Sequence, residues 1–173
     1  GPVYNCFYSS IRNNGCEMVS NSLIYNKETL RYEMDFEDLD RKLSHERARI
    51  MLLCNPHNPG GRVWSREELT HVAELCKKHG VRVVSDEIHC ELTLHGNEYT
   101  PFGSLPDELS FGSITCCSPS KAFNIAGLQI ANIVCRDAAV RERVDRAINI
   151  NEVCDVNPFG VEALMAAYTD GGE

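Results

Sequence analysis

Short apolar runs alternate with amphipathic stretches along this chain. The clearest unit starts at residues 50–54 (IMLLC), a continuous apolar run typical of a strand buried on both faces. A turn rich in Pro and Gly follows at 55–61, and a second apolar run covers 81–85. Between them, residues 65–80 place their apolar positions on one side of a helix. We therefore predict a βαβ crossover over residues 50–85.

The helix of this crossover carries start and stop signals. Ser65 and Glu68 form the capping-box pattern at its beginning, and we expect Gly80 to end it. The same patterns predict further strands and helices, namely strands at 112–117 and 129–135 and helices at 35–43, 137–149 and 159–168. This alternation predicts an α/β fold, a three-layer sandwich with a mainly parallel sheet of about four or five strands.

Composition narrows the class of protein without naming a function. The chain has 173 residues, enough for one domain, with ordinary fractions of hydrophobic (43%) and charged (24%) residues. A formal net charge of -8 repels a polyphosphate backbone, so we expect no nucleic-acid partner. No apolar run approaches the roughly 20 residues that span a bilayer, and no signal peptide is visible. We expect no membrane partner and a cytoplasmic location.

The cysteines and histidines do not form a metal-site pattern. None of the nine cysteines lies in a CxxC pair, and several fall inside apolar runs such as IMLLC and IANIVC. We expect reduced and mostly buried thiols rather than disulfides or zinc ligands. The histidines also lack metal-ligand spacing, so we expect no metal and place His57 at the surface.

Three loops follow predicted strands and carry polar side chains of different kinds. They cover residues 55–61, 85–89 and 117–128, and they contain an amide, a carboxylate and a lysine. In an open parallel sheet, ligands collect outside the carboxyl ends of the strands. A lysine amine can form an imine, a carboxylate can keep a pyridine nitrogen protonated, and an amide can donate to a ring oxygen. This set matches the needs of a pyridoxal cofactor.

Four motifs lie in these loops and near the start of the chain: PVY at 2–4, NPHNPG at 55–60, SDEIH at 85–89 and SPSKAFNIAG at 118–127. Their order and separations resemble those of the class I/II aminotransferases of pyridoxal-phosphate fold type I. Within that family the chain is similar to the cystathionine beta-lyase-like branch of carbon–sulfur lyases. The resemblance runs along essentially the whole chain.

The resemblance implies a role for each of four side chains. Lys121 corresponds to the lysine that binds pyridoxal 5'-phosphate as an imine and later moves the α-proton. Asp86 corresponds to the partner of the pyridine nitrogen, and Asn58 to the donor to the ring oxygen. Tyr4 occupies the position that stacks on the ring. The ordinary alternatives are a surface lysine, a helix N-cap, a turn-forming asparagine and a core tyrosine.

Five further positions follow from the same motifs. The resemblance implies that Ser118, and less strongly Ser120, bind the cofactor phosphate, with turn serines as the alternative. His89 stands where many aminotransferases have tyrosine, which favours the lyase branch. We expect a cis peptide bond before Pro59 and close packing at Gly127.

The leading hypothesis is a carbon–sulfur β-lyase that cleaves cystathionine or related cysteine conjugates to a thiol, pyruvate and ammonia. An aminotransferase with the same lysine is the first alternative. A cofactor-binding core without turnover is the second. A nicotinamide-binding Rossmann domain lacks its GxGxxG turn here. The resemblance also implies a homodimer and an amino-acid substrate.

The whole of residues 1–173 corresponds to the cofactor-binding large domain of the family, in incomplete form. The family also has an N-terminal segment with a phosphate-binding turn, and a C-terminal small domain with an arginine for the substrate carboxylate. Neither has a counterpart in this sequence. We therefore expect a fragment of a longer enzyme that, in isolation, binds cofactor weakly and turns over slowly or not at all.

Overall fold

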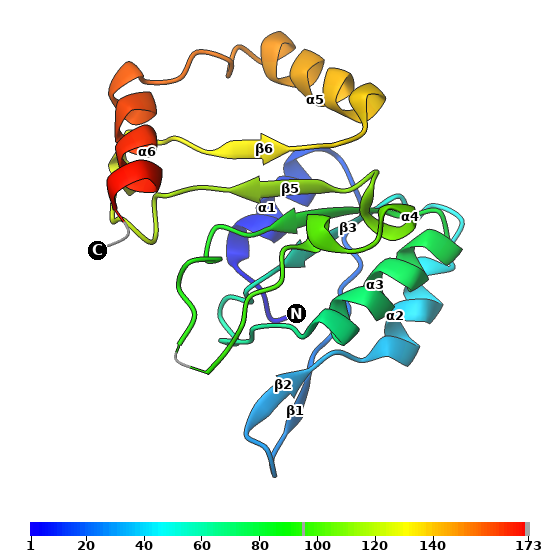
Figure 1. Cartoon of the computed structure of the whole chain (residues 1–173). Helices are drawn as coiled ribbons and strands as arrows, with labels where there is room; N and C mark the ends of the chain where they lie inside the picture. The colour runs from blue at the N-terminus through cyan, green and yellow to red at the C-terminus, as the bar shows by residue number, and fades with distance from the viewer. Residues whose placement is uncertain (95, 172–173) are drawn as a thin grey trace.

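The computed structural model describes residues 1–94 and 96–171, and its centre is a four-stranded sheet with the order β3-β4-β5-β6 (Figure 1). The strands are β3 (Ile50–Cys54), β4 (Arg82–Asp86), β5 (Ile114–Cys117) and β6 (Asn132–Val134). The pairs β3–β4 and β4–β5 are parallel, and β5–β6 is antiparallel. The predicted α/β fold with a mainly parallel sheet is thus confirmed.

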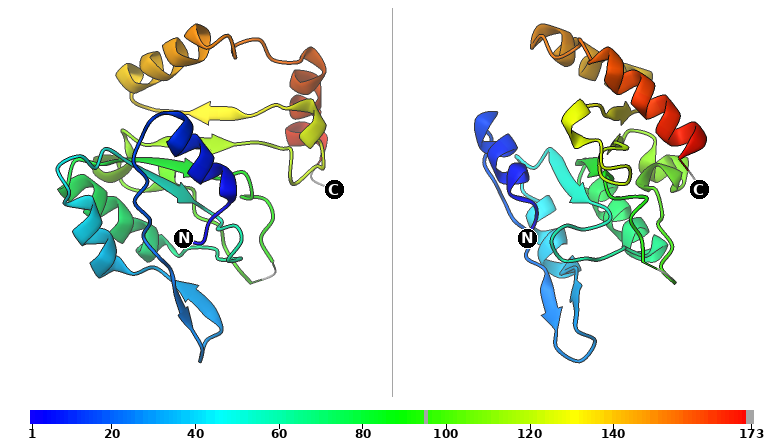
Figure 2. Two further views of the ribbon diagram at one scale, coloured as in Figure 1. Left: turned by 180° about the vertical axis from the view of Figure 1, so that it is seen from behind. Right: turned by 90° about the vertical axis from the view of Figure 1, so that its left-hand side faces the viewer.

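Helices lie on both faces of this sheet. Figure 2 shows the first helix on one face and the crossover helix on the opposite face. The helices are α1 (Asn5–Asn13), α2 (Phe36–Leu43), α3 (Arg66–Lys78), α4 (Asp107–Ser110), α5 (Ala138–Ile150) and α6 (Pro158–Asp170), with short 3-10 turns at η1 (Phe102–Ser104) and η2 (Ala126–Leu128). A two-stranded hairpin of β1 (Ile24–Asn26) and β2 (Arg31–Glu33) projects away from the sheet (Figure 1).

The predicted crossover is confirmed, including the capping of α3. The hydroxyl of Ser65 accepts the N–H of Glu68 at 3.1 Å, and the Glu68 carboxylate accepts the N–H of Ser65 at 2.8 Å. Gly80 follows the helix with a φ of +66°, the left-handed conformation that favours glycine. The strand expected at 129–135 is shorter, because Gln129 has a φ of +51° that delays its start. The prediction missed α1, α4 and the hairpin.

The hydrophobic core lies between α2, α3 and the first two strands of the sheet. Helix α3 turns its apolar face inward, and the side chains of Leu69 and Val72 are fully buried. Helix α2 adds Leu39 and Leu43 to the same cluster. Burial of this apolar face, at about 25 cal/mol per Å², is the main reason why α3 is stable against the sheet. The core therefore fixes the strands whose ends carry the predicted site.

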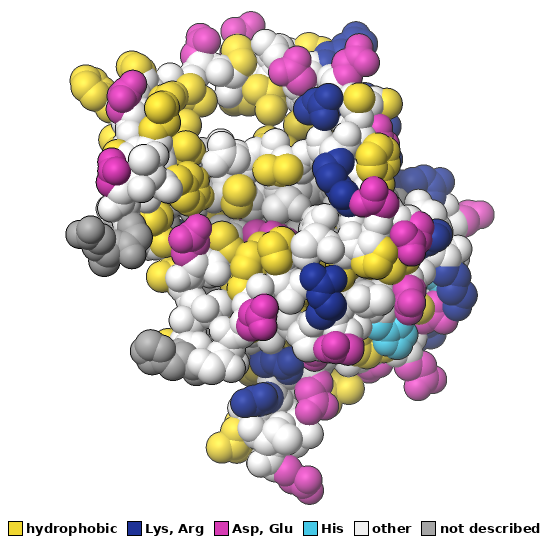
Figure 3. Space-filling view, in the orientation of Figure 1, with side chains coloured by type: hydrophobic (Ala, Val, Ile, Leu, Met, Phe, Trp, Pro, Cys, Tyr) yellow, Lys and Arg dark blue, Asp and Glu magenta, His cyan; other side chains and the backbone are white. Residues whose placement is uncertain are grey.

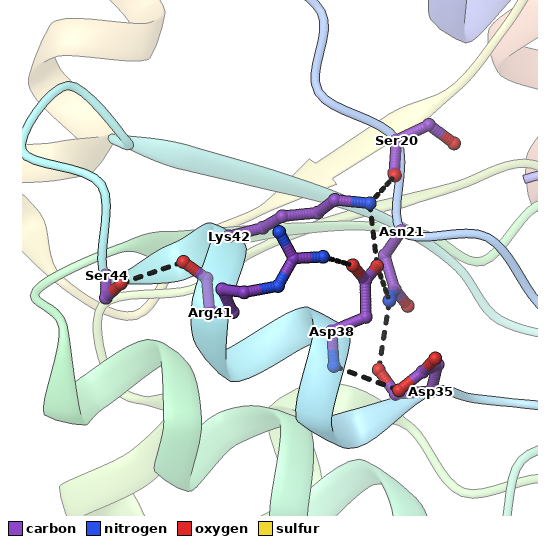
Figure 4. Close-up of polar contacts among 7 residues, drawn as sticks. All are labelled: Ser20, Asn21, Asp35, Asp38, Arg41, Lys42 and Ser44. Atoms are coloured by element: carbon purple, nitrogen blue, oxygen red, sulfur yellow. Dashed lines mark hydrogen bonds and ion pairs between the residues drawn. The ribbon is translucent and has the colours of Figure 1, made fainter.

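A polar network fastens α2 to the segment that precedes it (Figure 4). The ammonium of Lys42 donates to the carbonyl of Ser20 at 2.5 Å and to the carboxylate of Asp38 at 2.7 Å. Asn21 donates to the same carboxylate and to the carbonyl of Asp35, both at 2.9 Å. The bonds from Lys42 and then Asn21 lower the pKa of Asp38. These side chains thus hold Ser20 and Asn21, just before the hairpin, against α2.

The C-terminal helices are packed more loosely than α2 and α3. Figure 3 shows an opening between the arm that carries α5 and α6 and the sheet below it, with hydrophobic side chains around it. Phe159 and Met165 of α6 are 76% and 57% exposed. Only Val140 of α5 and Gly160 of α6 are buried among the described residues of these two helices. They therefore add little to the core.

All nine cysteines are free, as predicted. The expectation that most are buried is wrong, because only Cys54, Cys76 and Cys135 are buried, and the others are half-buried or exposed. Cys54 and Cys135 end the apolar runs IMLLC and IANIVC, and a position in such a run does predict burial. Among the described residues, no helix is long and apolar enough to cross a membrane.

Candidate active site

The carboxyl ends of β3, β4 and β5 form one edge of the sheet, and the hydrogen-bond ladder continues past the strands there. The N–H of Asn55 donates to the carbonyl of Asp86 at 2.9 Å, and the N–H of Glu87 donates to the carbonyl of Cys116 at 2.7 Å. Asp86 itself lies opposite Cys54 on one side and Cys116 on the other. The loops that follow these three strands therefore begin side by side.

Asn58 lies in the turn after β3 with its side-chain amide available. The peptide bond between Asn58 and Pro59 is cis, as predicted. The residue is half-buried, and its amide makes no hydrogen bond to another described residue. Its backbone is held at both ends, because its N–H donates to the sulfur of Cys54 at 3.3 Å and its carbonyl accepts the N–H of Tyr4 at 3.0 Å. Hydrogen bonds thus hold the backbone of Asn58, while its side-chain amide has no partner among the described residues.

Tyr4 comes directly before α1 and brings the start of the chain to this edge of the sheet. Its side chain is 48% exposed, so it is not the core tyrosine of the ordinary alternative. The pKa of its phenol is raised, first by a hydrogen bond with Cys6 and in smaller part by the negative charge of Asp86. The carboxylate of Asp86 therefore acts electrostatically on the phenol of Tyr4, as expected if both residues line the same cofactor site.

Asp86 and His89 each have one polar atom without a hydrogen-bond partner among the described residues. One carboxylate oxygen of Asp86 accepts the N–H of Ile88 at 3.2 Å, and the other makes no hydrogen bond to a described residue. A turn rather than a helix follows, so Asp86 does not cap a helix. The Nδ1 atom of His89 is buried and has no hydrogen-bond partner among the described residues. Buried polar atoms are rarely left in this state, so the Nδ1 atom of His89 fits a bound polar group.

Glu87, which the sequence analysis did not assign, is a fully buried carboxylate beside Asp86. It accepts hydrogen bonds from the hydroxyl of Ser85 at 2.8 Å, the N–H of Phe102 at 2.9 Å and the amide of Asn55 at 3.5 Å. The hydroxyl of Tyr99 is a fourth donor. Burial, and then the bond to Glu87, raise the pKa of Tyr99. This network ties the end of β4 to the segment before η1 and leaves Asp86 as the carboxylate that faces outward.

Lys121 lies in the tight turn that follows β5. It is exposed and forms no hydrogen bond or ion pair with another described residue. Before it, the hydroxyl of Ser118 donates to the carbonyl of Ile130 at 2.6 Å and accepts the N–H of Ser120 at 3.1 Å. The hydroxyl proton of Ser118 is therefore already used in the bond to Ile130. The hydroxyl of Ser120 donates to no described residue. The phosphate-binding roles of both serines stay predictions.

Two expectations about this region are wrong. Gly127 was expected to allow close packing, yet a Cβ atom there would have no neighbour within 4 Å. His57 was placed at the surface, but only 8% of it is exposed. Its turn folds back so that the ring lies edge-on to Trp64 at 5.6 Å, and its Nδ1 atom accepts the N–H of Gly60 at 3.2 Å. Burial lowers the pKa of His57 to about 4, so the ring is neutral and helps to shape the turn.

The described residues form no metal centre at this edge, and the hollow next to β5 does not include the predicted site residues. Among residues 1–94 and 96–171, no three His, Cys, Asp or Glu side chains are placed to hold a metal ion. A hollow of about 380 Å³ is lined by Glu87, Tyr99 and Tyr168, among others, but not by Lys121 or Asp86. The candidate site is therefore the edge of the sheet with its three loops, and Glu87 and Tyr99 belong to the lining of the separate hollow.

Comparisons with known proteins agree with this geometry. The sequence profile of the family "Aminotransferase class I and II" matches residues 1–171. Cystathionine beta-lyase PatB of Bacillus subtilis is 47% identical over 171 residues, which are 99% of this chain and 44% of that protein. Protein MalY of Escherichia coli is 32% identical over 98% of this chain and 43% of its own length.

Solved structures show the same relationship. Cystalysin from Treponema denticola, whose crystal structure contains pyridoxal 5'-phosphate, has a TM-score of 0.95 and 32% identity over 99% of this chain and 43% of its own. The pyridoxal-phosphate-bound C-S lyase from Staphylococcus hominis has a TM-score of 0.86 and 36% identity, over 98% of this chain and 43% of its own. The chain thus spans less than half the length of these relatives. It belongs to the aminotransferase class I and II family.

Proposed function

We propose that the full-length protein is a pyridoxal-phosphate-dependent carbon–sulfur β-lyase that acts on cystathionine or a related cysteine conjugate. The observation that carries the proposal is the meeting of three loops, with Asn58, Asp86 and Lys121, at one edge of the sheet. Relatives named as cystathionine beta-lyases and C-S lyases support the reaction class. Residues 1–173 would form part of its cofactor-binding large domain.

The side chains at this edge fit the cofactor. The outer oxygen of Asp86 is free to pair with a protonated pyridine nitrogen, and the amide of Asn58 is free to donate to a ring oxygen. The buried and unpaired Nδ1 atom of His89 suits a polar atom of the same ring. Lys121 is unbonded and accessible for imine formation. When bound, pyridoxal phosphate supplies an electron sink for a carbanion at the substrate Cα atom.

Each residue has a task that its surroundings allow. The amine of Lys121 would hold the cofactor and then carry the α-proton, because none of the described residues bonds to it. The carboxylate of Asp86 would keep the pyridine nitrogen protonated, since a charge pair at a half-buried site is stronger than in water. The Tyr4 ring, half exposed beside Asn58, would cover one face of the cofactor. The substrate carboxylate would be bound outside this chain.

The cofactor-binding lysine can be identified directly. The purified full-length protein should show the absorbance of bound pyridoxal phosphate. Reduction with borohydride followed by peptide mapping should place the cofactor on Lys121. A Lys121→Ala variant should lose the label, while Lys27→Ala, at an exposed lysine next to β1, should keep it. A label on any other lysine would refute the assignment.

The lyase and aminotransferase reactions are separated by their products. Incubation with cystathionine and without a keto acid should release thiol and pyruvate in equal amounts if the protein is a lyase. A requirement for a keto acid, with amino-group exchange and no thiol release, would favour the aminotransferase. The isolated 173-residue chain is expected to bind cofactor weakly, and robust turnover by that chain alone would refute this expectation. The homodimer stays a prediction.

A further inference from the structure

Cys54 is the last residue of β3, and its side chain contacts the turn that carries Asn58. It is 4% exposed. Its sulfur accepts the N–H of Asn58 at 3.3 Å, and the same thiol donates to the carbonyl of Pro56 at 3.3 Å. Both contacts lie within the usual range for bonds that involve sulfur. One side chain thus connects two backbone groups of the turn to the strand below it.

The thiol can make both bonds at neutral pH because it keeps its proton. Burial, with the nearby charge of Asp86 adding to it, raises the pKa of Cys54 to about 11. A protonated thiol is a weak donor and a weak acceptor at the same time, whereas a thiolate only accepts. The donor contact to Pro56 and the acceptor contact to Asn58 therefore coexist.

The position of the sulfur is itself fixed relative to Asp86. Cys54 pairs with Asp86 in the parallel ladder between β3 and β4. Its carbonyl also accepts the indole N–H of Trp64 at 2.9 Å, and Trp64 is almost completely buried. The side chain of Asn58 has no anchor of its own among the described residues, so its direction follows from how its backbone is held.

We propose that Cys54 is a positioning residue, whose thiol sets the direction of the Asn58 amide relative to Asp86 and thereby the affinity for the pyridoxal cofactor. The inference rests on the proposed function. Alanine at this position would leave the N–H of Asn58 without its acceptor and release the turn. Serine would restore a hydroxyl that can donate and accept, although its shorter bond to Cβ would lengthen both contacts.

Cys76 provides a matched control within the same chain. It is another buried thiol, 2% exposed, and lies on α3, where its one hydrogen-bond partner among the described residues is the sulfur of Met51 at 3.6 Å. Replacement of Cys76 by alanine removes the same atoms from the core without touching the turn. The two alanine variants should therefore lose similar packing free energy, and of the two only Cys54→Ala removes the contacts to Asn58 and Pro56.

The experiment uses the full-length protein as wild type, Cys54→Ala, Cys54→Ser and Cys76→Ala. Titration of the cofactor-free proteins with pyridoxal phosphate gives the dissociation constant. Amide hydrogen exchange gives the protection of the Asn58 N–H. Cys54→Ala should weaken cofactor binding about tenfold, the equivalent of one lost hydrogen bond, and speed exchange at Asn58. Cys54→Ser should recover part of both losses, and Cys76→Ala should show neither.

Equal cofactor affinity in Cys54→Ala and Cys76→Ala would overturn the inference, because it would reduce Cys54 to a packing residue. If Cys54→Ala does not fold, Cys54→Ser carries the test, and an affinity and exchange rate like those of Cys76→Ala would have the same meaning. A wild-type protein without cofactor binding would instead overturn the proposed function and the inference with it. Normal cofactor binding with an unprotected Asn58 amide would overturn the inference alone.

Discussion

The backbone N–H of Tyr4 donates a hydrogen bond of 3.0 Å to the carbonyl of Asn58. This bond connects the start of the chain to the turn after β3, across 54 positions of sequence, and joins two residues that the motifs had assigned to one cofactor. Because it uses main-chain atoms only, it does not depend on the tyrosine side chain. The fold holds the Tyr4 ring near Asn58, and the ring itself is free to serve a ligand.

Substitution of the Tyr4 side chain should therefore change cofactor binding without changing stability. Tyr4→Phe keeps the aromatic ring, and we expect its cofactor affinity to stay within about twofold of wild type. Tyr4→Ala removes the stacking surface and should weaken affinity by about 2- to 10-fold. Since the side chain is half exposed, both variants should unfold within about 0.5 kcal/mol of wild type. Cofactor titration and urea unfolding measure the two effects, and a large loss of stability in Tyr4→Phe would contradict this view.

Asp86→Asn should abolish most activity while preserving the fold. The amide oxygen of asparagine can still accept the N–H of Ile88, so the local turn survives. The negative charge that we propose to pair with the pyridine nitrogen is lost, and we expect a loss on the order of 100-fold or more in kcat. Steady-state kinetics with cystathionine, next to a thermal unfolding curve, separate the two effects. Wild-type kcat in this variant would rule out Asp86 as the partner of the cofactor.

In contrast to Asp86→Asn, Glu87→Gln should clearly lower the free energy of unfolding. Three donors bond to Oε1 of Glu87 and the Tyr99 hydroxyl bonds to Oε2, so the NH2 group of a glutamine would face at least one donor. An unsatisfied buried donor costs about 1–3 kcal/mol, which urea unfolding would detect. Glu91→Gln, at an exposed carboxylate of the following turn, is the matched control and should change stability by less than about 0.5 kcal/mol. Equal stability of the two variants would contradict the role of the network.

The positions of Asn58, Asp86 and Lys121 at one edge followed from local patterns, because an apolar run followed by a polar loop marks the end of a buried strand. The partners of Glu87 did not follow, since Tyr99 and Phe102 lie 12 and 15 residues away and reach it only through the folded loop. The hairpin and α1 were missed for a related reason. No residue of α1 or of the three-residue strands β1 and β2 is buried, so none of them contains a continuous apolar run of the kind that marked β3.

The burial of His57 also could not be predicted from local sequence patterns, and it leads to a prediction about pH. A histidine between two prolines in a polar turn has no pattern that signals burial, yet burial lowers its pKa from 6.5 to about 4. Between these values the unfolded chain binds a proton that the folded chain does not. The contribution of His57 to stability is therefore complete above about pH 6.5 and is lost as the pH falls toward 4, by up to about 3 kcal/mol, since one pKa unit corresponds to about 1.4 kcal/mol.

His57→Asn tests this directly, because the asparagine oxygen can accept the N–H of Gly60 but does not titrate. The free energy of unfolding of the cofactor-free full-length protein, measured in urea at pH 7 and at pH 4.5, should fall less in this variant than in wild type. His71→Asn, at an exposed histidine of α3, should leave the difference between the two pH values unchanged. The same acid-induced loss in His57→Asn and wild type would show that His57 stays accessible to protons in the folded state, and that the turn before Pro59 is more open than the hydrogen bonds of its backbone imply.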